Sequence, residues 1–491
     1  MRIAYIHPPF ETVIPVGEQT ATASLIIWQN EIASRLAKQH QLVVFSKGDK
    51  GHSGRVQYGN IEYRYISSQL INLERRFTNG LSRLEQLFNY PRPKRPIFAG
   101  NWYYPLYIRL ISRALSQEHW DIIHLTQFAQ YAPIIRKHNP DARIVIHMHA
   151  PWLGQFERDA VHPSIAAADM LIVVSNYIAQ GILRKFPELK DRVHIVHNGI
   201  DTRRFEQYAE HDSGHELMNA ATEPVIDPVT ATPNSIDKVQ RILYVGRVSP
   251  EKGVHVLIDA FVQLADRFPN AVLEIVGGLA AVAYQFVIPM DDDQLVQDLA
   301  RFYKGPWRKD NYMNALQHLI PEGLRSRVHF LGPRSQEQLK EYFRRATVCV
   351  FPSVVREAFS IAVIEGMASG VAAICTEGGG GGEIMEHEVT GMLVPRGDQE
   401  ALGQAITRLL ENPQLRRQYG KAAQRKVSGM FTWDEAARLL EKHYLELVYP
   451  AVKTSTIYPQ DGSTETNMST TELSSGIETN ALYSPSGSNA K

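Results

Sequence analysis

The segment that decides the fold is TVCVFPSVVREAFSIAVIEGMASG, residues 347–370. It begins with a short continuous run of apolar and β-branched residues, a pattern typical of a strand that is buried on both faces. A loop follows, and a helix is predicted from about Ser360 to Ser369 because Gly370 suits the left-handed position that ends a helix. A buried strand followed by a helix is the repeating unit of a parallel α/β sheet.

This alternation of strands and helices runs along most of the chain. The strands predicted in the first half are RIAYI, QLVVFS, DIIHL, RIVIHM, DMLIVVS and VHIVH. Those predicted in the second half are RILYVG, AVLEIVG, VHFLG, TVCVF and VAAIC. Amphipathic helices lie between them, and one apolar stripe consists of Val254, Leu257, Ile258 and Phe261. Because 491 residues exceed what a single core usually fills, two parallel-sheet domains are expected.

Composition marks the limits of the predicted units. Residues 206–237 contain no Lys or Arg and three prolines, which indicates a flexible acidic linker. Residues 279–327 form an irregular insert, and the Ser/Thr-rich end of the chain lacks periodicity. The predicted units are a first doubly wound domain (1–205), the linker (206–240), a second doubly wound domain (241–432), a C-terminal helix (433–450) and a disordered tail (451–491).

The charge balance and the cysteines exclude several classes of protein. Lys plus Arg and Asp plus Glu number 52 each, which argues against a dedicated nucleic-acid-binding protein. Cys349 and Cys375 lie in apolar runs, so neither a disulfide scaffold nor a zinc site is expected. No run approaches the ~18 apolar residues of a membrane span, and no signal-peptide core is visible. A cytoplasmic protein is therefore expected.

Candidate ligand-binding residues follow several of the predicted strands. In doubly wound sheets, ligands bind at the carboxyl ends of the strands. Arg247 and Lys252 come between a strand and a helix, where two cations suit a diphosphate, although two solvated surface cations explain the same pattern. In the first half, His149 ends a strand and can donate to a phosphate or sugar hydroxyl. Gly17 lies in the first strand–helix loop and permits close approach of a ligand to the backbone.

Two glutamates flank the predicted helix of the opening segment. Glu357 lies in the loop before it and Glu365 lies within it, about 80° apart around the helix axis at 100° per residue. They can border one cleft at different depths, and carboxylates accept hydrogen bonds well from neighbouring sugar hydroxyls. The alternative is one glutamate that complements the helix dipole and one that is solvated.

Two further clusters give weaker signals. The run Gly378–Gly382 permits positive φ angles and close approach of the backbone to a ligand. Asp291–Asp293 precede a helix, and helix capping explains them more simply than a metal site does. No metal and no other cofactor is predicted.

Taken in order, these motifs resemble the retaining GT-B glycosyltransferases of family 4, the glycosyl transferases group 1. The likeness is dense over 242–278 and 328–395 and thinner over 1–200. The resemblance implies a GT-B fold, with two Rossmann-like domains around an interdomain cleft. The matching segments are HIVHNGID (194–201), ILYVGRVSPEKG (242–253), LEIVGG (273–278), VHFLG (328–332), VFPSVVREAFSIAVIEGMASG (350–370) and GGGGGEIMEHEVTGMLVP (378–395).

The resemblance also implies roles for residues. Arg247 and Lys252 would hold the donor diphosphate, Glu357 the hydroxyls of the donor sugar, and Glu365 those of the ribose. The implied catalytic set is His149, Arg247, Lys252 and Glu357. The implied donor-binding set is Gly17, Arg247, Lys252, Glu357, Phe359, Ser360, Ile361 and Glu365. The chain departs from the family pattern at Ala358 and Ser360, where glycine is frequent, and it has a single glycine in its first loop.

The expected function is therefore that of a retaining hexosyltransferase. It would move a sugar from a nucleotide-diphosphate donor to a cell-envelope polysaccharide, a glycolipid or a small acceptor. Two alternatives remain open at this point, a nucleotide-sugar epimerase of the same fold and a non-catalytic relative that binds sugar nucleotides. Family members are usually described as reacting on one face of the sugar, with the leaving phosphate helping to deprotonate the acceptor.

A basic and aromatic segment suggests where the acceptor is met. Residues 71–113 hold eight Lys or Arg against two acids, Glu74 and Glu85. Such a surface suits anionic membrane headgroups, and a lipid-linked acceptor at the inner face of the membrane would fit it. A solvated helix face with ordinary core aromatics explains the same residues. The aromatic residues are Phe77, Phe88, Trp102, Tyr103, Tyr104 and Tyr107, and the basic ones are Arg75, Arg76, Arg83, Arg92, Lys94, Arg95, Arg109 and Arg113.

Overall fold

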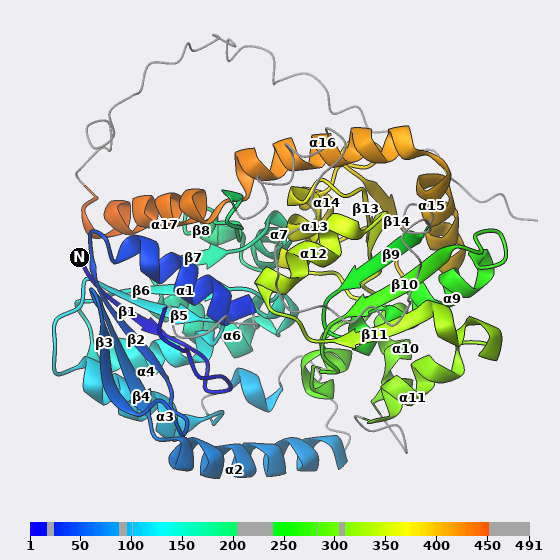
Figure 1. Ribbon diagram of the computed structural model, residues 1–491. Coiled ribbons are helices and arrows are strands. Elements are labelled where there is room, and N and C mark those ends of the chain that lie inside the picture. Colours follow the sequence, from blue (N-terminus) through cyan, green and yellow to red (C-terminus); the bar gives the residue numbers. More distant parts are fainter. Residues whose placement is uncertain are drawn as a thin grey trace, which may run out of the picture.

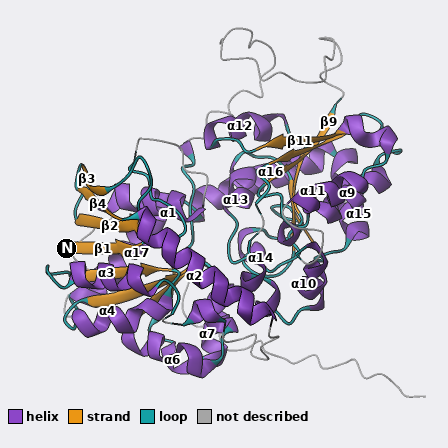
Figure 2. Ribbon diagram, turned by 90° about the horizontal axis from the view of Figure 1, so that it is seen from below, coloured by secondary structure: helices purple, strands orange, loops and turns teal. Residues whose placement is uncertain are grey.

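The computed structural model describes residues 1–16, 24–87, 96–100, 102–203, 239–280, 282–303 and 310–450. Gly17, the predicted tail and nearly all of the predicted linker lie outside these residues. Within them the chain forms two separate parallel-type sheets, one in each half of the sequence. Figure 2 shows the two sheets in different parts of the molecule, with helix α13 (Ile361–Ala368) between them.

The first sheet has eight strands in the order β3-β4-β2-β1-β5-β6-β7-β8 among the described residues. Its neighbouring strands are parallel apart from the β3–β4 hairpin, which the sequence patterns did not indicate because the residues of β3 are largely polar and exposed. The strands are β1 (Arg2–Ile6), β2 (Gln41–Lys47), β3 (Gly54–Tyr58), β4 (Ile61–Ile66), β5 (Ile122–Thr126), β6 (Arg143–Met148), β7 (Met170–Val173) and β8 (Val193–Ile195).

The second sheet is parallel throughout, in the order β11-β10-β9-β12-β13-β14. Each strand predicted in this half is present. Cys349 and Cys375 are buried free thiols on two of these strands, as predicted. The strands are β9 (Gln240–Val245), β10 (Ala271–Val276), β11 (Val328–Gly332), β12 (Val348–Phe351), β13 (Ala373–Thr376) and β14 (Met392–Val394).

Helices cover both faces of each sheet, because the strands are apolar on both faces. Those of the first half are α1 (Ser24–Leu36), α2 (Ser68–Leu87), α3 (Pro105–Leu115), α4 (Ala132–His138), α5 (Trp152–Gln155), α6 (Arg158–Ala167) and α7 (Asn176–Lys185). Those of the second half are α9 (Val254–Leu264), α10 (Gln294–Asp298), α11 (Asp310–His318), α12 (Gln336–Arg345), α13, α14 (Gly381–Ile384), α15 (Gln399–Glu411), α16 (Pro413–Met430) and α17 (Trp433–Val448).

Helix α13 confirms the prediction made from the opening segment. It runs from Ile361 to Ala368, and Gly370 follows with a φ of 73°. A left-handed residue at this point lets the chain leave the helix without the penalty that a Cβ atom would bring.

The last helix joins the two domains. Figure 1 shows α16 beside the second domain and α17 running on over the first, next to α1. The buried Tyr444 hydroxyl of α17 lies 2.6 Å from Nδ1 of His124 and 3.2 Å from the Tyr5 hydroxyl, both in the first sheet. The core under α17 therefore contains side chains from both domains.

None of the helices among the described residues combines the length and the apolar character needed to cross a bilayer.

Candidate active site

Lys252 and Glu357 form an ion pair at the carboxyl ends of the strands of the second domain. Lys252 ends the short 3-10 turn Pro250–Lys252 after β9, and Glu357 lies in the loop between β12 and α13. Their Nζ and Oε1 atoms are 2.5 Å apart, and the Ser353 hydroxyl donates to the same carboxylate oxygen. Burial alone would raise the pKa of Glu357, but the charge and hydrogen bond of Lys252 lower it below its ordinary value. The carboxylate is therefore ionised at neutral pH.

A glycine allows these two segments to meet. Gly253 has a φ of 71°, and a Cβ atom there would lie 1.9 Å from the carbonyl oxygen of Pro352. The backbone N–H of Val354 also donates to the carbonyl of Glu251 over 3.0 Å. Glycine is thus required where the turn that carries Lys252 packs against the loop that leads to Glu357.

Arg247 lies beside this pair and faces the first domain. Its Nη2 atom is 3.3 Å from Oε1 of the buried Glu251, whose other oxygen accepts a 3.0 Å hydrogen bond from the Tyr303 hydroxyl. Glu11, in the loop after β1, has its pKa raised by burial, and the charge of Arg247 opposes that shift. Arg247 therefore acts electrostatically across the boundary between the domains. Glu11 was not singled out from the sequence, although it follows a strand end.

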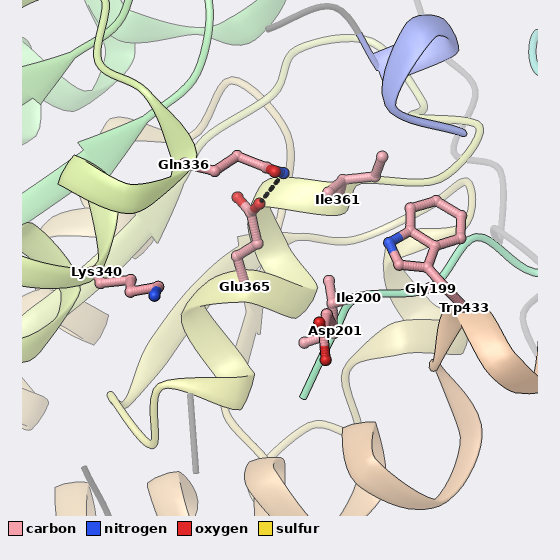
Figure 3. A pocket seen from close by; sticks show the side chains of 8 residues that line it. All are labelled: Gly199, Ile200, Asp201, Gln336, Lys340, Ile361, Glu365 and Trp433. Atoms are coloured by element: carbon pink, nitrogen blue, oxygen red, sulfur yellow. Dashed lines mark hydrogen bonds between the residues drawn. The ribbon is translucent and has the colours of Figure 1, made fainter. Parts of the chain in front are cut away.

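Glu365 lies apart from Glu357, in a pocket between the two domains. Its side chain is 7% exposed, and Nε2 of Gln336 donates to its Oε1 over 3.1 Å. Figure 3 shows the side chain of Lys340 reaching toward the same space from α12. The pocket is lined by Gly199, Ile200, Asp201, Gln336, Lys340, Ile361, Glu365 and Trp433. Both carboxylates thus border the interdomain region at different places, and Gln336 and Lys340 are neighbours that the sequence motifs did not reveal.

The three residues between the glutamates differ in what they contact. The ring of Phe359 stacks on His197 of the first domain, with centroids 5.6 Å apart, and it also contacts Phe431. Ser360 is the N-cap residue of α13, but its side chain makes no capping hydrogen bond. Ile361 lines the pocket beside Glu365. The side chain of Phe359 therefore contributes to the contact between the domains.

His149 follows β6 at the carboxyl end of the first sheet. Trp152, three residues further on, stacks on Phe286 of the second domain at 5.4 Å, so this loop borders the other domain. The imidazole packs on His147 at 4.2 Å and against the edge of Trp28. Burial, aided by the neighbouring His7, lowers the pKa of His149 to about 3. Its Nε2 atom is buried and has no hydrogen-bond partner among the described residues, so a polar group of this ring is left unsatisfied.

Gln127 positions the segment that carries His149. It follows β5 and has a φ of 74°, a strained value for a residue with a side chain. Its Oε1 atom accepts a 2.6 Å hydrogen bond from the backbone N–H of His149. Sequence reasoning missed Gln127, although a polar residue at the end of a strand adjacent to that of His149 was a usable signal.

The glycine run approaches the protein's own backbone at two of its positions. A Cβ atom at Gly379 would lie 2.2 Å from the carbonyl oxygen of Glu357, and one at Gly380 would lie 2.3 Å from that of Ala358. The N–H of Gly380 donates to the Glu357 carbonyl over 2.7 Å. The predicted positive φ angles are present at Gly378 and Gly379. The close approach was expected to serve a ligand, whereas here it fixes the loop that carries Glu357.

The aspartate cluster caps a helix, as expected. Oδ1 of Asp293 accepts from the N–H of Leu295 over 3.0 Å at the start of α10. Oδ2 of Asp293 also pairs with Arg356 at 2.9 Å and with Arg396. No group of three or more potential metal-binding side chains occurs among the residues that the structure describes. The ion pairs connect the insert to the loop that carries Glu357, a link that the sequence did not reveal.

Two family models match the chain, and together they cover more than half of it. The model described as Glycosyltransferase Family 4 matches residues 30–204, and the model described as Glycosyl transferases group 1 matches residues 230–426. A putative glycosyltransferase of Bacillus subtilis, YtcC, is 24% identical over 371 residues, which are 74% of this chain and 82% of that protein.

Solved structures share the fold. Sucrose-phosphate synthase from Thermosynechococcus elongatus matches with a TM-score of 0.59 at 20% identity. The match covers 91% of this chain and 98% of the synthase chain. Anabaena HepE, solved in complex with UDP and glucose, matches with a TM-score of 0.56 at 17% identity. The match covers 90% of this chain and 98% of the HepE chain. The chain therefore belongs to the glycosyl transferases group 1 and is a glycosyltransferase with the GT-B fold.

Proposed function

We propose that the protein transfers a hexosyl unit, with retention of anomeric configuration, from a nucleoside diphosphate sugar to a hydroxyl group of a polysaccharide, glycolipid or small acceptor. The observation that carries this proposal is the Lys252–Glu357 ion pair beside Arg247. Two cations and a carboxylate at the strand ends of one domain match the diphosphate and the hydroxyl groups of such a donor.

Donor binding would exchange partners within this cluster. Lys252 and Arg247 would turn toward the diphosphate, and Glu357 would accept hydrogen bonds from sugar hydroxyls. Because each group already has a partner of opposite charge, no isolated charge has to be buried before the donor arrives. The amides of Phe359, Ser360 and Ile361 lie in the segment that starts α13 and would contact the sugar and phosphate.

The nucleoside would lie near the interdomain pocket. Glu365 would accept hydrogen bonds from the ribose hydroxyls, and the 3.1 Å hydrogen bond from Gln336 orients its carboxylate. Lys340 lines the same pocket. Since an ionised carboxylate has several acceptor positions, Glu365 can keep the bond to Gln336 while it binds a ligand.

The reaction breaks the bond between the anomeric carbon and a diphosphate oxygen. Negative charge develops on that oxygen, and Arg247 and Lys252 stabilise it. The acceptor hydroxyl forms the new bond to the anomeric carbon and gives its proton to the leaving phosphate. The carboxylate of Glu357 is held by Lys252 and Ser353, which suits hydroxyl binding better than attack on the sugar. Neutral His149 would bind a sugar hydroxyl from the side of the first domain.

A screen of nucleotide sugars tests the proposal. The purified protein is heated with UDP-, GDP- and ADP-sugars, and a matching donor is expected to raise Tm by several degrees at saturating concentration. The same donor with an acceptor panel should release the nucleoside diphosphate, and Glu357→Ala should abolish that release. If no nucleotide sugar stabilises the protein, the proposal is wrong.

Incubation with donor alone separates transfer from epimerisation. A transferase leaves the sugar configuration of the donor unchanged, apart from slow hydrolysis. Formation of an epimeric nucleotide sugar without any acceptor would contradict the proposal, and nuclear magnetic resonance of the sugar protons would detect it.

A second part of the proposal is that the first domain contacts anionic lipid at the inner face of the membrane, where it meets a lipid-linked acceptor. Leu73, Phe77 and Trp102 are 64%, 55% and 70% exposed around α2 and the start of α3. Exposed basic residues accompany them, namely Arg75, Arg76, Arg109 and Arg113. Figure 1 shows α2 along an outer edge of the first domain.

Glu74 turns away from this surface, and the side chains of Arg83 and Glu85 lie outside the described residues. Glu74 is buried and accepts hydrogen bonds from the first turn of α3, at the N–H groups of Leu106 and Tyr107. Tyr103, Tyr104 and Tyr107 belong to the core, as the alternative explanation expected. Phe88, Arg92, Lys94 and Arg95 lie outside the described residues. Exposed apolar side chains next to exposed cations are the combination that favours anionic headgroups.

Vesicle flotation at low salt tests this part. The protein should float with phosphatidylglycerol vesicles and not with phosphatidylcholine vesicles, and Phe77→Ser together with Trp102→Ser should weaken flotation without changing Tm. Lack of binding to anionic vesicles would remove the membrane from the proposal and leave the sugar transfer intact.

A further inference from the structure

Glu383 of the second domain binds the first domain through both of its carboxylate oxygens. It lies in α14, directly after the glycine run. Oε2 accepts a 2.7 Å hydrogen bond from the backbone N–H of Asn176, and Oε1 accepts a 2.8 Å bond from that of Tyr177. These two N–H groups open helix α7. The contact therefore joins one domain to the other over 207 and 206 positions of sequence.

The start of α7 depends on this carboxylate. The first N–H groups of a helix have no partner inside it. In α7 the N–H of Ile178 is bound by the side chain of Ser175, and those of Asn176 and Tyr177 are bound by Glu383. A carboxylate at a helix N-terminus gains from the helix dipole, and hydrogen bonds to an ionised acceptor are stronger than neutral ones. Loss of Glu383 would return two N–H groups to water.

The other end of the same segment is fixed to the loop that carries Glu357. The N–H of Gly380 donates to the Glu357 carbonyl over 2.7 Å, and Gly379 leaves no room for a Cβ atom against that carbonyl. A continuous series of contacts thus runs from α7 through Glu383 and the glycine run to Glu357 and its partner Lys252.

We infer that Glu383 is a positioning residue that couples closure of the two domains to the placement of Glu357. When the domains approach, the carboxylate reaches the start of α7 and the glycine run is held in place. When they separate, the two hydrogen bonds break, and the loop of Glu357 loses its outer support. This inference rests on the proposed function, in which Glu357 binds the donor sugar.

Hydrogen exchange tests the contact without any substrate. In Glu383→Ala the amide protons of Asn176 and Tyr177 should exchange at least tenfold faster than in the wild type, while that of Ile178, which Ser175 binds, should change little. Glu383→Gln, which keeps one acceptor oxygen, should have a smaller effect. The control is Glu386→Gln, an exposed glutamate three residues further on, which should leave all three rates unchanged. Unchanged exchange at Asn176 and Tyr177 in Glu383→Ala would overturn the inference.

Kinetics then test the coupling to the donor site. Glu383→Ala should lower kcat/KM for the donor roughly tenfold, with Glu383→Gln in between and Glu386→Gln at the wild-type value. Faster exchange without any change in kcat/KM would show a contact that does not position Glu357, and the inference would be wrong. If no donor is turned over by the wild type, the proposed function fails, whereas the exchange result still decides whether Glu383 holds the domains together.

Discussion

The two domains present different kinds of groups to each other. On the second domain, Lys252 and Glu357 are charged and paired, and Arg247 is paired with Glu251. On the first domain, His149 is neutral, with its pKa lowered to about 3 by burial and by His7. The second domain thus offers paired full charges at short range, whereas around His149 the first domain offers neutral polar rings packed on aromatic side chains.

This difference separates two ways of recognising a ligand. Paired ions can exchange one partner for a phosphate or hydroxyl at little cost, and they stabilise charge that develops in a reaction. A neutral ring in an apolar surrounding selects by hydrogen-bond direction and by shape, since a charged ligand would lose its hydration there. In the proposed function, the second domain would therefore hold the anionic donor, and the first an uncharged part of the acceptor.

The largest expected effect comes from removing the cation at the centre of the charged side. Lys252→Ala leaves Glu357 without its partner and removes a charge from the leaving diphosphate, so kcat/KM should fall about 1000-fold. Steady-state release of nucleoside diphosphate measures it. Lys252→Arg, which keeps the charge in a different geometry, should be less impaired. If the kcat/KM of the Lys252→Ala enzyme lay within threefold of the wild-type value, Lys252 would not be the cation that stabilises the leaving diphosphate.

The next effect distinguishes the two carboxylates of the second domain. Glu357→Gln should lower sugar transfer about 100-fold while the Kd of the free nucleoside diphosphate changes less than about threefold, because Glu357 pairs with Lys252 at the proposed sugar site. Glu365→Gln should do the reverse, because Glu365 lines the interdomain pocket. Transfer assays and calorimetric titration with the nucleotide separate the two. Equal effects of both variants on nucleotide binding would contradict the assignment.

A smaller effect tests whether the packing of the glycine run holds the loop that carries Glu357 in place. Gly379→Ala places a Cβ atom against the Glu357 carbonyl at a φ of 63°, and it should lower the free energy of unfolding by about 2 kcal/mol. Gly382→Ala is the matched control, since nothing lies within 4 Å of its added atom. Denaturant titration of both variants gives the values. If Gly379→Ala and Gly382→Ala had similar free energies of unfolding, the loop would accommodate the added Cβ atom, and Gly379 would not be needed for packing.

The smallest effect concerns the neutral side and its response to pH. The folded pKa of His149 lies below its ordinary value of 6.5, so the unfolded chain takes up the proton first as the pH falls below 6.5, and stability is lost from there toward pH 3. At pH 5.5 this loss is on the order of 1 kcal/mol. His149→Gln should remove it, so the stability difference between variant and wild type should shift in favour of the variant between pH 7 and 5.5.

Glu357 provides the contrasting case for that measurement. Its pKa is lowered, so the stabilisation from its ion pair is present above its ordinary value of 4.5 and is lost as the pH falls below it. Between pH 6.5 and 4.5, the loss of stability linked to His149 should therefore proceed before that linked to Glu357 begins. A pH-independent difference between His149→Gln and wild type over pH 7 to 5.5 would show that the imidazole is not held neutral by burial.

Much of the fold could be predicted because the signals are local. A continuous apolar run predicts a strand that is buried on both faces, and Gly370 predicts the end of α13 within a few residues. Strand β3 was missed because it is polar and exposed, and β4 was missed although most of its residues are buried, because Glu62 and Arg64 interrupt its apolar run. Arg247, Lys252, Glu357 and His149 could be singled out because strand ends mark the ligand edge of a parallel sheet.

The sequence by itself determined the alternation of strands and helices, the number of sheets and the chemical types at the strand ends, because these depend on neighbouring residues. Only the tertiary structure decided which groups are partners. Glu74 caps α3, Gln127 holds His149, and Glu383 reaches α7, each across 22 or more positions of sequence. The glycine run in the sequence indicated that positive φ angles are possible there. It did not indicate that the carbonyl of Glu357 lies against Gly379. Charge, burial and hydrogen bonding act through space, and the fold alone sets those distances.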